Sequence, residues 1–328
     1  MEVLVTGGTG FLGQHLARAL LAKGHSVHIL ARNFAKAGPR ELIAGGAIPI
    51  SADLRDRAAI DAACAGIEVV FHTGAISAPW GKFVDFHDIN VGGTEAVLAG
   101  CLAHGVGRLI YVSSPSVVFD GRDQRLALED VPYPHRFTST YSLTKKLGED
   151  RVNAAAAAGF QTVILRPKAI FGPGDQALLP RLIAAARKKR LPQIGDGNNL
   201  VDLTYVENVV QALMLALDAP AATGNTYTIT NDEHVPLWDI VRSVLSRLNL
   251  STKLRRVPLS VALAAASLME LRAALTGQEP LLTRYTAAIL ARTQTYDISA
   301  AKRDLGYAPC VSIADGTERT LEALEGQT

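Results

Sequence analysis

The chain has 328 residues and a formal net charge of +2, with 48% hydrophobic and 20% charged residues. This balance is typical of folded globular proteins and excludes a disordered chain. The one dense basic run, residues 187–190, falls where a helix is expected to end, so we expect no nucleic-acid partner. Three cysteines without metal-ligand spacing predict no metal site, and with no N-terminal signal pattern they favour a cytoplasmic location.

Short β-branched segments alternate with longer helical patterns up to about residue 173, which is typical of a parallel sheet covered by helices. Six strands are predicted at residues 3–6, 26–30, 47–50, 68–72, 108–113 and 162–166, and a seventh at 225–229. Helices are predicted at 10–23, 56–65, 88–104 and 138–158, each followed closely by a glycine. We expect a doubly wound α/β sheet of about seven strands.

Residues 6–13 read Thr-Gly-Gly-Thr-Gly-Phe-Leu-Gly and join the first predicted strand to the first helix. Glycines at this turn allow backbone N–H groups to approach a pyrophosphate at the positive end of the helix, as in Rossmann-type folds. An ordinary glycine-rich turn is the alternative. The sequence therefore predicts a dinucleotide site formed by Gly7, Thr9, Gly10, Phe11, Leu12 and Gly13.

The residues after the second strand predict which dinucleotide is bound. An acidic residue about 20 positions beyond the turn normally binds the ribose of NAD, but residues 14–40 contain no Asp or Glu. Arg32 follows the strand directly, and a guanidinium suits a 2′-phosphate. We expect NADP(H) to be preferred, with NAD(H) possible. Asp53, with Leu54 beside it, either accepts a hydrogen bond from the adenine or caps a helix.

Tyr141 and Lys145 stand four positions apart in a predicted helix, so both project from one face. A nearby ammonium is expected to lower the pKa of the phenol and prepare it for proton transfer. Many surface helices carry the same spacing, but Ser113 and Ser114 end the fifth strand at the sheet edge where ligands bind. We expect Ser114 to orient a carbonyl and Ser113 to form a turn before Pro115.

These motifs together resemble the extended short-chain dehydrogenase/reductases over nearly the whole chain. The resemblance is greatest to their 3β-hydroxysteroid dehydrogenase-like branch, and within it to the 2-alkyl-3-oxoalkanoate reductases of bacterial olefin synthesis. It implies Tyr141 as proton donor, Lys145 as ligand of the nicotinamide ribose, and Asn90 as the residue that orders the helix or a water. It also adds to the expected cofactor site His72, Gly74, where alanine is usual, and Pro167.

The resemblance implies a Rossmann-type NADP-binding domain at residues 1–174 and about 202–230. Residues of about 175–201 and 231–328 would form a smaller, mainly helical cap that binds the substrate. Helices 88–104 and 138–158 commonly pair across a two-fold axis in this superfamily, so a homodimer is expected. An apolar stretch of about 13 residues from position 257 is too short to cross a bilayer, so we expect no transmembrane segment.

The expected reaction is NADP(H)-dependent reduction of a ketone, or the reverse oxidation of a secondary alcohol, on a small hydrophobic substrate. Apolar residues of the cap, including 257–266, 281–282 and 285–290, line a substrate cavity or pack in the core, and Trp80 is a further candidate. Lys168 either pairs with a substrate carboxylate or points to solvent. A nucleotide-sugar epimerase or dehydratase, with Arg181 and Arg284 as phosphate ligands, and a non-catalytic dinucleotide sensor are the alternatives.

Overall fold

The computed structural model describes residues 1–326 and shows seven parallel strands in one sheet, in the order β12-β7-β5-β4-β1-β2-β3. The prediction of a seven-stranded parallel sheet is confirmed. The strands are β1 (Glu2–Thr6), β2 (Ser26–Ala31), β3 (Ile48–Ser51), β4 (Val69–His72), β5 (Arg108–Val112), β7 (Thr162–Pro167) and β12 (Thr226–Ile229).

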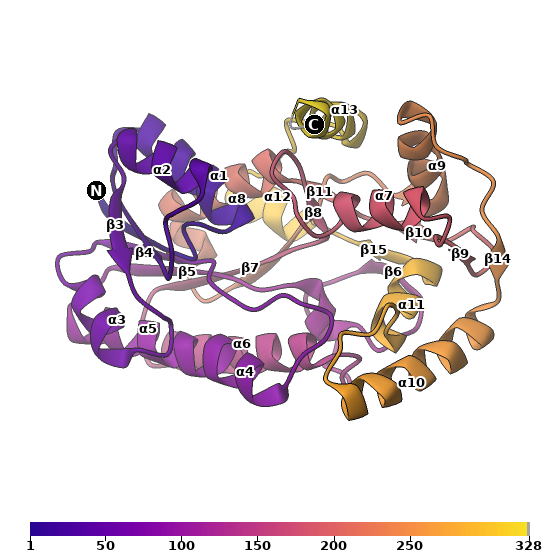
Figure 1. The fold of residues 1–328 in the computed structure, drawn as a ribbon. Helices are drawn as coiled ribbons and strands as arrows, with labels where there is room; N and C mark the ends of the chain where they lie inside the picture. The colour runs from indigo at the N-terminus through magenta and orange to yellow at the C-terminus, as the bar shows by residue number, and fades with distance from the viewer. Residues whose placement is uncertain (327–328) are drawn as a thin grey trace.

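The central strands are apolar on both sides, because each face of the sheet is covered by helices. Along β7, Val163 and Leu165 join one core, whereas Ile164 between them joins the other. The first face holds α1 (Phe11–Ala22), α2 (Ala37–Ala44), α8 (Val206–Asp218) and α12 (Ser299–Leu305), and the second holds α3 (Arg57–Cys64), α5 (Gly93–Ala103) and α6 (Thr140–Ala157), as Figure 1 shows.

The predicted helix 88–104 is interrupted. A short helix α4 (Phe83–His87) precedes a π-helical turn η1 (Asp88–Gly92), and α5 then continues from it. Turns of this kind are rare and are frequently found at functional sites. This one carries Asn90, so the irregularity coincides with a predicted site residue.

The rest of the chain adds smaller elements at one end of the sheet (Figure 1). Besides helices it forms a four-stranded sheet and two strand pairs. Their strands are only two to four residues long, which is too short to be predicted from a sequence pattern. The helices are η2 (Pro115–Val118), α7 (Leu179–Arg187), η3 (Pro220–Ala222), α9 (Leu237–Arg247), α10 (Leu259–Thr276), α11 (Arg284–Ala291) and α13 (Ile313–Glu325). The strands are β6 (Gln124–Ala127), β8 (Ile170–Phe171), β9 (Gln193–Ile194), β10 (Leu200–Val201), β11 (Thr204–Tyr205), β13 (Val235–Pro236), β14 (Arg256–Val257) and β15 (Gln294–Tyr296).

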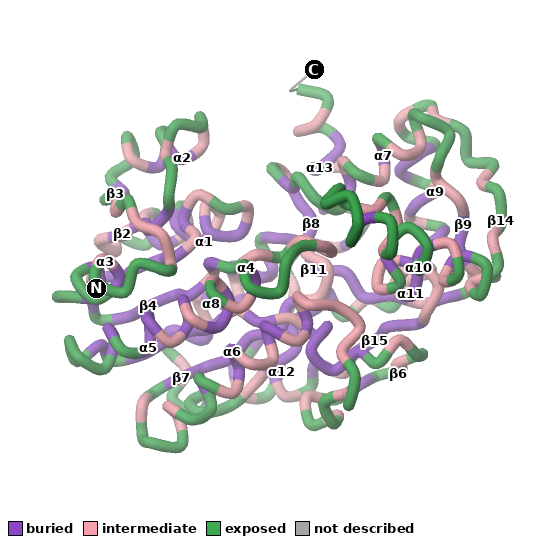
Figure 2. The backbone as a smooth tube through the Cα atoms, turned by 60° about the horizontal axis from the view of Figure 1, so that its bottom comes forward, coloured by how far each residue is buried: buried purple, intermediate pink, exposed green. Residues whose placement is uncertain are grey.

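Helix α10 is longer and more exposed than the sequence predicts. It continues past Glu270, whose carboxylate is paired with Arg284 of α11 at 2.8 Å. It ends at Thr276, before Gly277 in the left-handed conformation. By length and composition alone it is apolar enough to cross a membrane, and 17% of it is buried. The expectation that this segment is too short was therefore wrong. Val261 and Leu281, predicted to line a cavity or the core, are instead 55% and 86% exposed. Figure 2 shows the exposed backbone along much of α10.

Candidate active site

The glycine turn between β1 and α1 leaves no space for side chains at three of its positions. Gly7 has a left-handed φ of +69°, and a Cβ added to it would lie 2.7 Å from the Cα of Gly74. A Cβ on Gly13 would collide with the carbonyl oxygen of Gly7, and one on Gly8 would lie 2.6 Å from the Ile29 Cβ. The start of α1 therefore packs directly against the turn, and its first N–H groups, at Phe11, Leu12 and Gly13, have no acceptor within the helix.

A pocket of about 220 Å³ lies against this turn. It brings together half of the residues that the sequence predicts for the cofactor and adds residues of the loop after β4. The predicted residues outside its lining are Phe11, Leu12, Gly13, His72, Tyr141, Lys145 and Pro167. Its lining consists of Gly7, Thr9, Gly10, Leu30, Ala31, Arg32, Ala52, Asp53, Leu54, Thr73, Gly74, Ala75, Ile76 and Ile89. Such a pocket at the carboxyl edge of a parallel sheet is suited to a dinucleotide.

Arg32 and Asp53 both line the pocket, but only Arg32 is free to bind a ligand by an ion pair. The Arg32 side chain is exposed and makes no hydrogen bond or ion pair with any described residue. Asp53 is held by Arg55 through hydrogen bonds of 2.9 and 2.8 Å to its two oxygens, and this lowers its pKa to about 2. Asp53 is not a helix cap, because Asp56 caps α3 by accepting from the Ala59 N–H.

Two predicted cofactor residues lie beneath or beside the turn. The His72 ring is buried and uses both nitrogens, bonding the Thr6 hydroxyl at 2.6 Å and the Thr94 hydroxyl at 3.0 Å. Burial lowers its pKa to about 3, so it is neutral and supports the turn without a free nitrogen. Gly74 lies in the loop after β4 and packs against the turn: an alanine Cβ there would lie 3.2 Å from the Gly7 nitrogen and 2.9 Å from the Leu54 Cδ1.

Tyr141 lies in the first turn of α6, which begins cleanly because Ser139 and Ser142 form a capping box. The Ser114 hydroxyl, at the end of β5, lies close enough to the phenol to lower its pKa. Burial nevertheless outweighs this effect and raises the pKa of Tyr141 to about 12. Ser114 also accepts a hydrogen bond from the Ser116 N–H at 3.2 Å, which fixes its position.

Lys145 lies one turn further along α6 and points beneath the site. Its ammonium donates to the Val112 carbonyl at 2.7 Å and sits 4.0 Å from the centre of the Tyr111 ring. Burial lowers the pKa of Lys145 to about 7, while the charge of Glu149 opposes this. The predicted lowering of the Tyr141 pKa by Lys145 is therefore wrong for this geometry, because the ammonium is directed at β5.

Asn90 connects two parts of the site. Its amide exchanges hydrogen bonds with both backbone groups of Ile76, at 2.8 and 3.0 Å, and donates to the Thr144 hydroxyl at 3.1 Å. It thus ties the loop after β4 to α6. The expectation that Asn90 orders this helix agrees with these contacts, and the side chain reaches neither Tyr141 nor Lys145 by a hydrogen bond.

Four further candidate residues come from the end of β7, the loop before α4 and helix α11. Pro167, at the end of β7, is buried. Lys168 turns inward and donates to the Gln294 amide oxygen at 2.7 Å, so it does not point to solvent, and burial lowers its pKa to about 8. Tyr285 of α11 packs against Phe119 with ring centres 6.5 Å apart, near enough to Tyr141 for their charges to interact. Trp80 is half-buried in the loop before α4.

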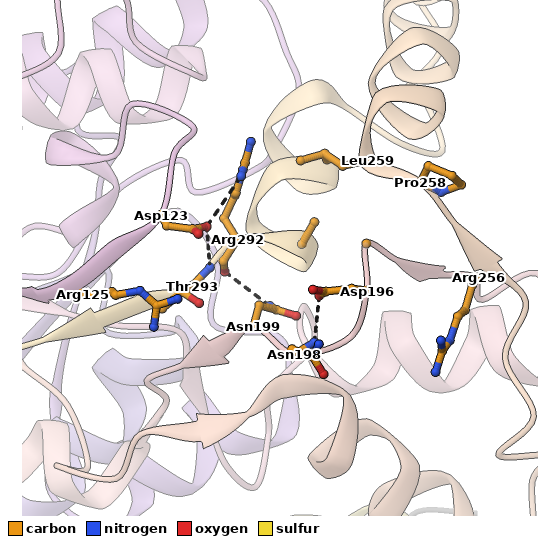
Figure 3. A pocket seen from close by; sticks show the side chains of 12 residues that line it. Asp123, Arg125, Asp196, Asn198, Asn199, Arg256, Pro258, Leu259, Arg292 and Thr293 are labelled. Atoms are coloured by element: carbon orange, nitrogen blue, oxygen red, sulfur yellow. Dashed lines mark hydrogen bonds and ion pairs between the residues drawn. The ribbon is translucent and has the colours of Figure 1, made fainter.

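A separate pocket of about 530 Å³ lies in the cap, between β6, β9 and the start of α10 (Figure 3). Arg292 faces Asp123 there at 3.8 Å, whereas Arg125 and Arg256 have no carboxylate partner in the described part of the chain. Residues of this group come from four distant segments, so no local sequence pattern indicates it. Among residues 1–326, no cluster of His, Cys, Asp and Glu is arranged to hold a metal ion.

Comparison with known proteins identifies the family. The sequence profile of the 3-beta hydroxysteroid dehydrogenase/isomerase family matches residues 4–259. The chain belongs to this family. It is 41% identical to the 2-alkyl-3-oxoalkanoate reductase of Stenotrophomonas maltophilia (strain K279a), over 97% of this chain and 98% of that one. It is 38% identical to 3beta-hydroxysteroid-dehydrogenase/decarboxylase isoform 1 of Arabidopsis thaliana, over 98% and 79%.

Solved structures with the same fold include MoeE5 in complex with UDP-glucose and NAD, with a TM-score of 0.79 at 26% identity and coverage of 100% and 99%. The chain is therefore an NAD(P)-binding oxidoreductase of the extended short-chain dehydrogenase/reductase type, and the predicted family is confirmed. Its named relatives act on ketone or hydroxyl groups of hydrophobic compounds.

Proposed function

We propose that this protein uses NADPH to reduce the ketone of a hydrophobic 3-oxo compound, such as a 2-alkyl-3-oxo acid, or oxidises the corresponding alcohol. The observation that carries the proposal is the position of Tyr141 and Ser114 together at the carboxyl edge of β5, next to the glycine-turn pocket. When bound, the dinucleotide supplies or accepts the hydride. The named reductase and sterol relatives support a hydrophobic substrate.

The proton chemistry belongs to this chain. With a pKa of about 12, Tyr141 keeps its proton at neutral pH and can give it to a developing alkoxide. The Ser114 hydroxyl lies beside it and can donate a second hydrogen bond to the same oxygen. Lys145 keeps its contact with the Val112 carbonyl and supplies positive charge below the site.

The preference for NADPH rests on Arg32. Its unpaired guanidinium on the wall of the glycine-turn pocket favours a 2′-phosphate, and the pocket's one carboxylate, Asp53, is neutralised by Arg55. The solved complexes of MoeE5 with UDP-glucose and with UDP-glucuronic acid contain NAD. Equal-concentration assays with NADPH and NADH test the preference directly, and faster turnover of NADH would overturn it.

A nucleotide-sugar epimerase is the second candidate, favoured by the pocket in Figure 3 and by the UDP-sugar complexes of the structural relatives. The cations expected for this activity are occupied, since Arg181 pairs with Glu279 at 3.3 Å and Arg284 with Glu270 at 2.8 Å. Arg125 and Arg256 are the unpaired alternatives for a diphosphate.

A substrate panel separates the two candidates. Purified protein is incubated with NADPH and a 2-alkyl-3-oxo acid or a ketosteroid while NADPH consumption is followed. In parallel it is incubated with NAD⁺ or NADP⁺ and UDP-glucose while epimerisation of the sugar is followed. We expect consumption with the 3-oxo acid and no change in the sugar. Sugar turnover without ketone reduction would replace the reductase by an epimerase, and NADPH binding without turnover of any of them would favour the sensor.

We propose further that the protein is a homodimer in the cytoplasm. The dimer would pair α5 and α6 with the same helices of a second copy. Leu102 at the end of α5 is 60% exposed and fits a covered position in such a pair. Light scattering at micromolar concentration should give twice the chain mass, and a monomer would contradict the pairing.

A further inference from the structure

From Leu268 onward, helix α10 places its large apolar side chains outward, whereas Leu259 and Leu263 near its start pack against the small core. The three residues that it buries are all alanines, Ala262, Ala266 and Ala273, which pack toward α11 and the small core beneath it. Leu268, Leu271 and Leu275 are 70%, 61% and 81% exposed. The hydrophobic effect normally places leucine inward and the smaller or polar residues outward on a surface helix, so this orientation is reversed.

The exposed positions form one continuous stripe. Residues 261, 264, 268, 271 and 275 are exposed and separated by three or four positions, so they lie on one face of the helix. The stripe extends over about 21 Å, at about 1.5 Å per residue. Leu281, five residues after the end of the helix, is a further exposed leucine. Soluble proteins rarely expose a patch of this kind unless it contacts something.

Unpaired positive charges lie just before the helix and on it. Lys253, Arg255 and Arg256 precede the helix and Arg272 lies on it, all four exposed and with no side-chain hydrogen bond or ion pair to any described residue. The nearest carboxylates do not offset them, because Glu270 and Glu279 are paired with Arg284 and Arg181. The surface therefore combines an apolar strip with net positive charge.

We propose that α10 docks flat on an anionic phospholipid surface, with its leucine stripe among the acyl chains and the four cations against the headgroups. This surface does not depend on the proposed reductase activity. A second copy of the stripe is a poorer partner, because it would bring like charges together. Crossing the bilayer would require α10 to leave α11 and separate Glu270 from Arg284.

Vesicle flotation tests the proposal with the full-length protein. Vesicles of equal parts phosphatidylcholine and phosphatidylglycerol should carry the protein upward in the gradient, and vesicles of phosphatidylcholine alone should bind it far less. High salt should weaken the binding, because it screens the contribution of the cations. Equal binding to both vesicles, or binding to neither, would overturn the proposal.

Two sets of variants separate the apolar and charged contributions. The triple change Leu268→Gln, Leu271→Gln and Leu275→Gln should weaken binding about a hundredfold or more. Lys253→Gln with Arg255→Gln and Arg272→Gln should weaken it about fivefold per charge. The second set leaves Arg256, which also lines the pocket of Figure 3, unchanged.

The matched control is Leu128→Gln with Ile48→Gln, since these side chains are 50% and 43% exposed and belong to other elements, the segment after β6 and strand β3. It should bind as wild type. All variants should keep the wild-type unfolding midpoint, because the changed side chains are exposed. Unchanged binding of the leucine variant would overturn the proposal. So would loss of self-association in that variant alone, which indicates an interface between copies, or resistance to alkaline carbonate, which indicates a spanning helix.

Discussion

Arg166 on β7 and Glu149 on α6 are joined by two parallel hydrogen bonds, Nε to Oε1 at 2.8 Å and Nη2 to Oε2 at 2.7 Å. Both side chains are almost fully buried, and the Tyr133 hydroxyl donates to the same carboxylate at 2.7 Å. The negative charge of Glu149 adds to the effect of burial in raising the pKa of Tyr141. For Lys145 it opposes burial, which lowers the pKa. This pair therefore connects the sheet to the predicted catalytic helix and affects its electrostatics.

Replacing Glu149 by glutamine should destabilise the protein by about 3–5 kcal/mol, because it leaves the buried Arg166 without a counter-charge. Urea unfolding followed by circular dichroism measures the change. Lys146→Gln is the control on the same helix: its pair with Asp150 is partly exposed, so its removal should cost no more than about 0.5 kcal/mol. A loss below about 1 kcal/mol for Glu149→Gln would show that the pair contributes little to stability.

The pKa of Lys145 predicts a pH dependence of activity. Burial lowers it from 10.5 to about 7, so the ammonium is lost as the pH rises through about 7. If its charge assists the reaction, kcat/KM for carbonyl reduction should be highest below that pH and fall above it. Tyr141, with a pKa of about 12, stays protonated throughout this range. A pH profile of kcat/KM from mildly acidic to mildly alkaline conditions measures the fall.

Lys145→Arg is the matched variant, because a guanidinium keeps its charge across the whole range. The fall should disappear even if the overall rate is lower. The same shift affects stability in the opposite direction: between about pH 7 and 10.5 the unfolded chain binds more protons than the folded one, so Lys145 makes stability rise with pH. A fall in kcat/KM that persists unchanged in the arginine variant would assign it to another group.

The features predicted correctly from the sequence depend on local chemistry. The β-branched segments identify all seven strands of the sheet, and the glycines at positions 7 and 13 are required by a backbone contact that no side chain permits. Tyr141 and Ser114 come together because β5 ends, and helix α6 begins, at the same edge of the parallel sheet. Each of these features is determined either by neighbouring residues in the sequence or by the topology of a parallel sheet.

The features missed from the sequence depend on distant contacts. Arg181 and Arg284 are expected to be free cations, but each meets a carboxylate that only the fold brings near. The outward orientation of the leucines of α10 could not be predicted either, because an apolar sequence does not show which of its side chains the fold leaves exposed. The pKa of Lys145 is lowered because its ammonium is buried against β5. The four-residue spacing on α6 does not predict this burial.

Tyr141→Phe removes the proposed proton donor while keeping the ring. Turnover should fall about 10²- to 10⁴-fold, the usual contribution of a positioned acid, while the dissociation constant for NADPH stays within about twofold. Steady-state kinetics and quenching of protein fluorescence by the dinucleotide measure the two quantities. Ser114→Ala should lower kcat by a smaller factor, because the phenol still donates to the substrate. Wild-type turnover in Tyr141→Phe would reject the assignment.

Arg32→Asp reverses the charge at the predicted 2′-phosphate position. Because a carboxylate repels that phosphate and accepts hydrogen bonds from a free ribose, KM for NADPH should rise about tenfold or more, and KM for NADH should stay level or fall. Arg40→Asp is the control, an exposed arginine of α2 that does not line the glycine-turn pocket, and it should change neither constant appreciably. Initial rates with both dinucleotides at one ketone concentration give the comparison. Equal increases of KM for NADPH and NADH in Arg32→Asp would indicate a damaged pocket and no contact with the 2′-phosphate, whereas a selective increase for NADPH supports the contact.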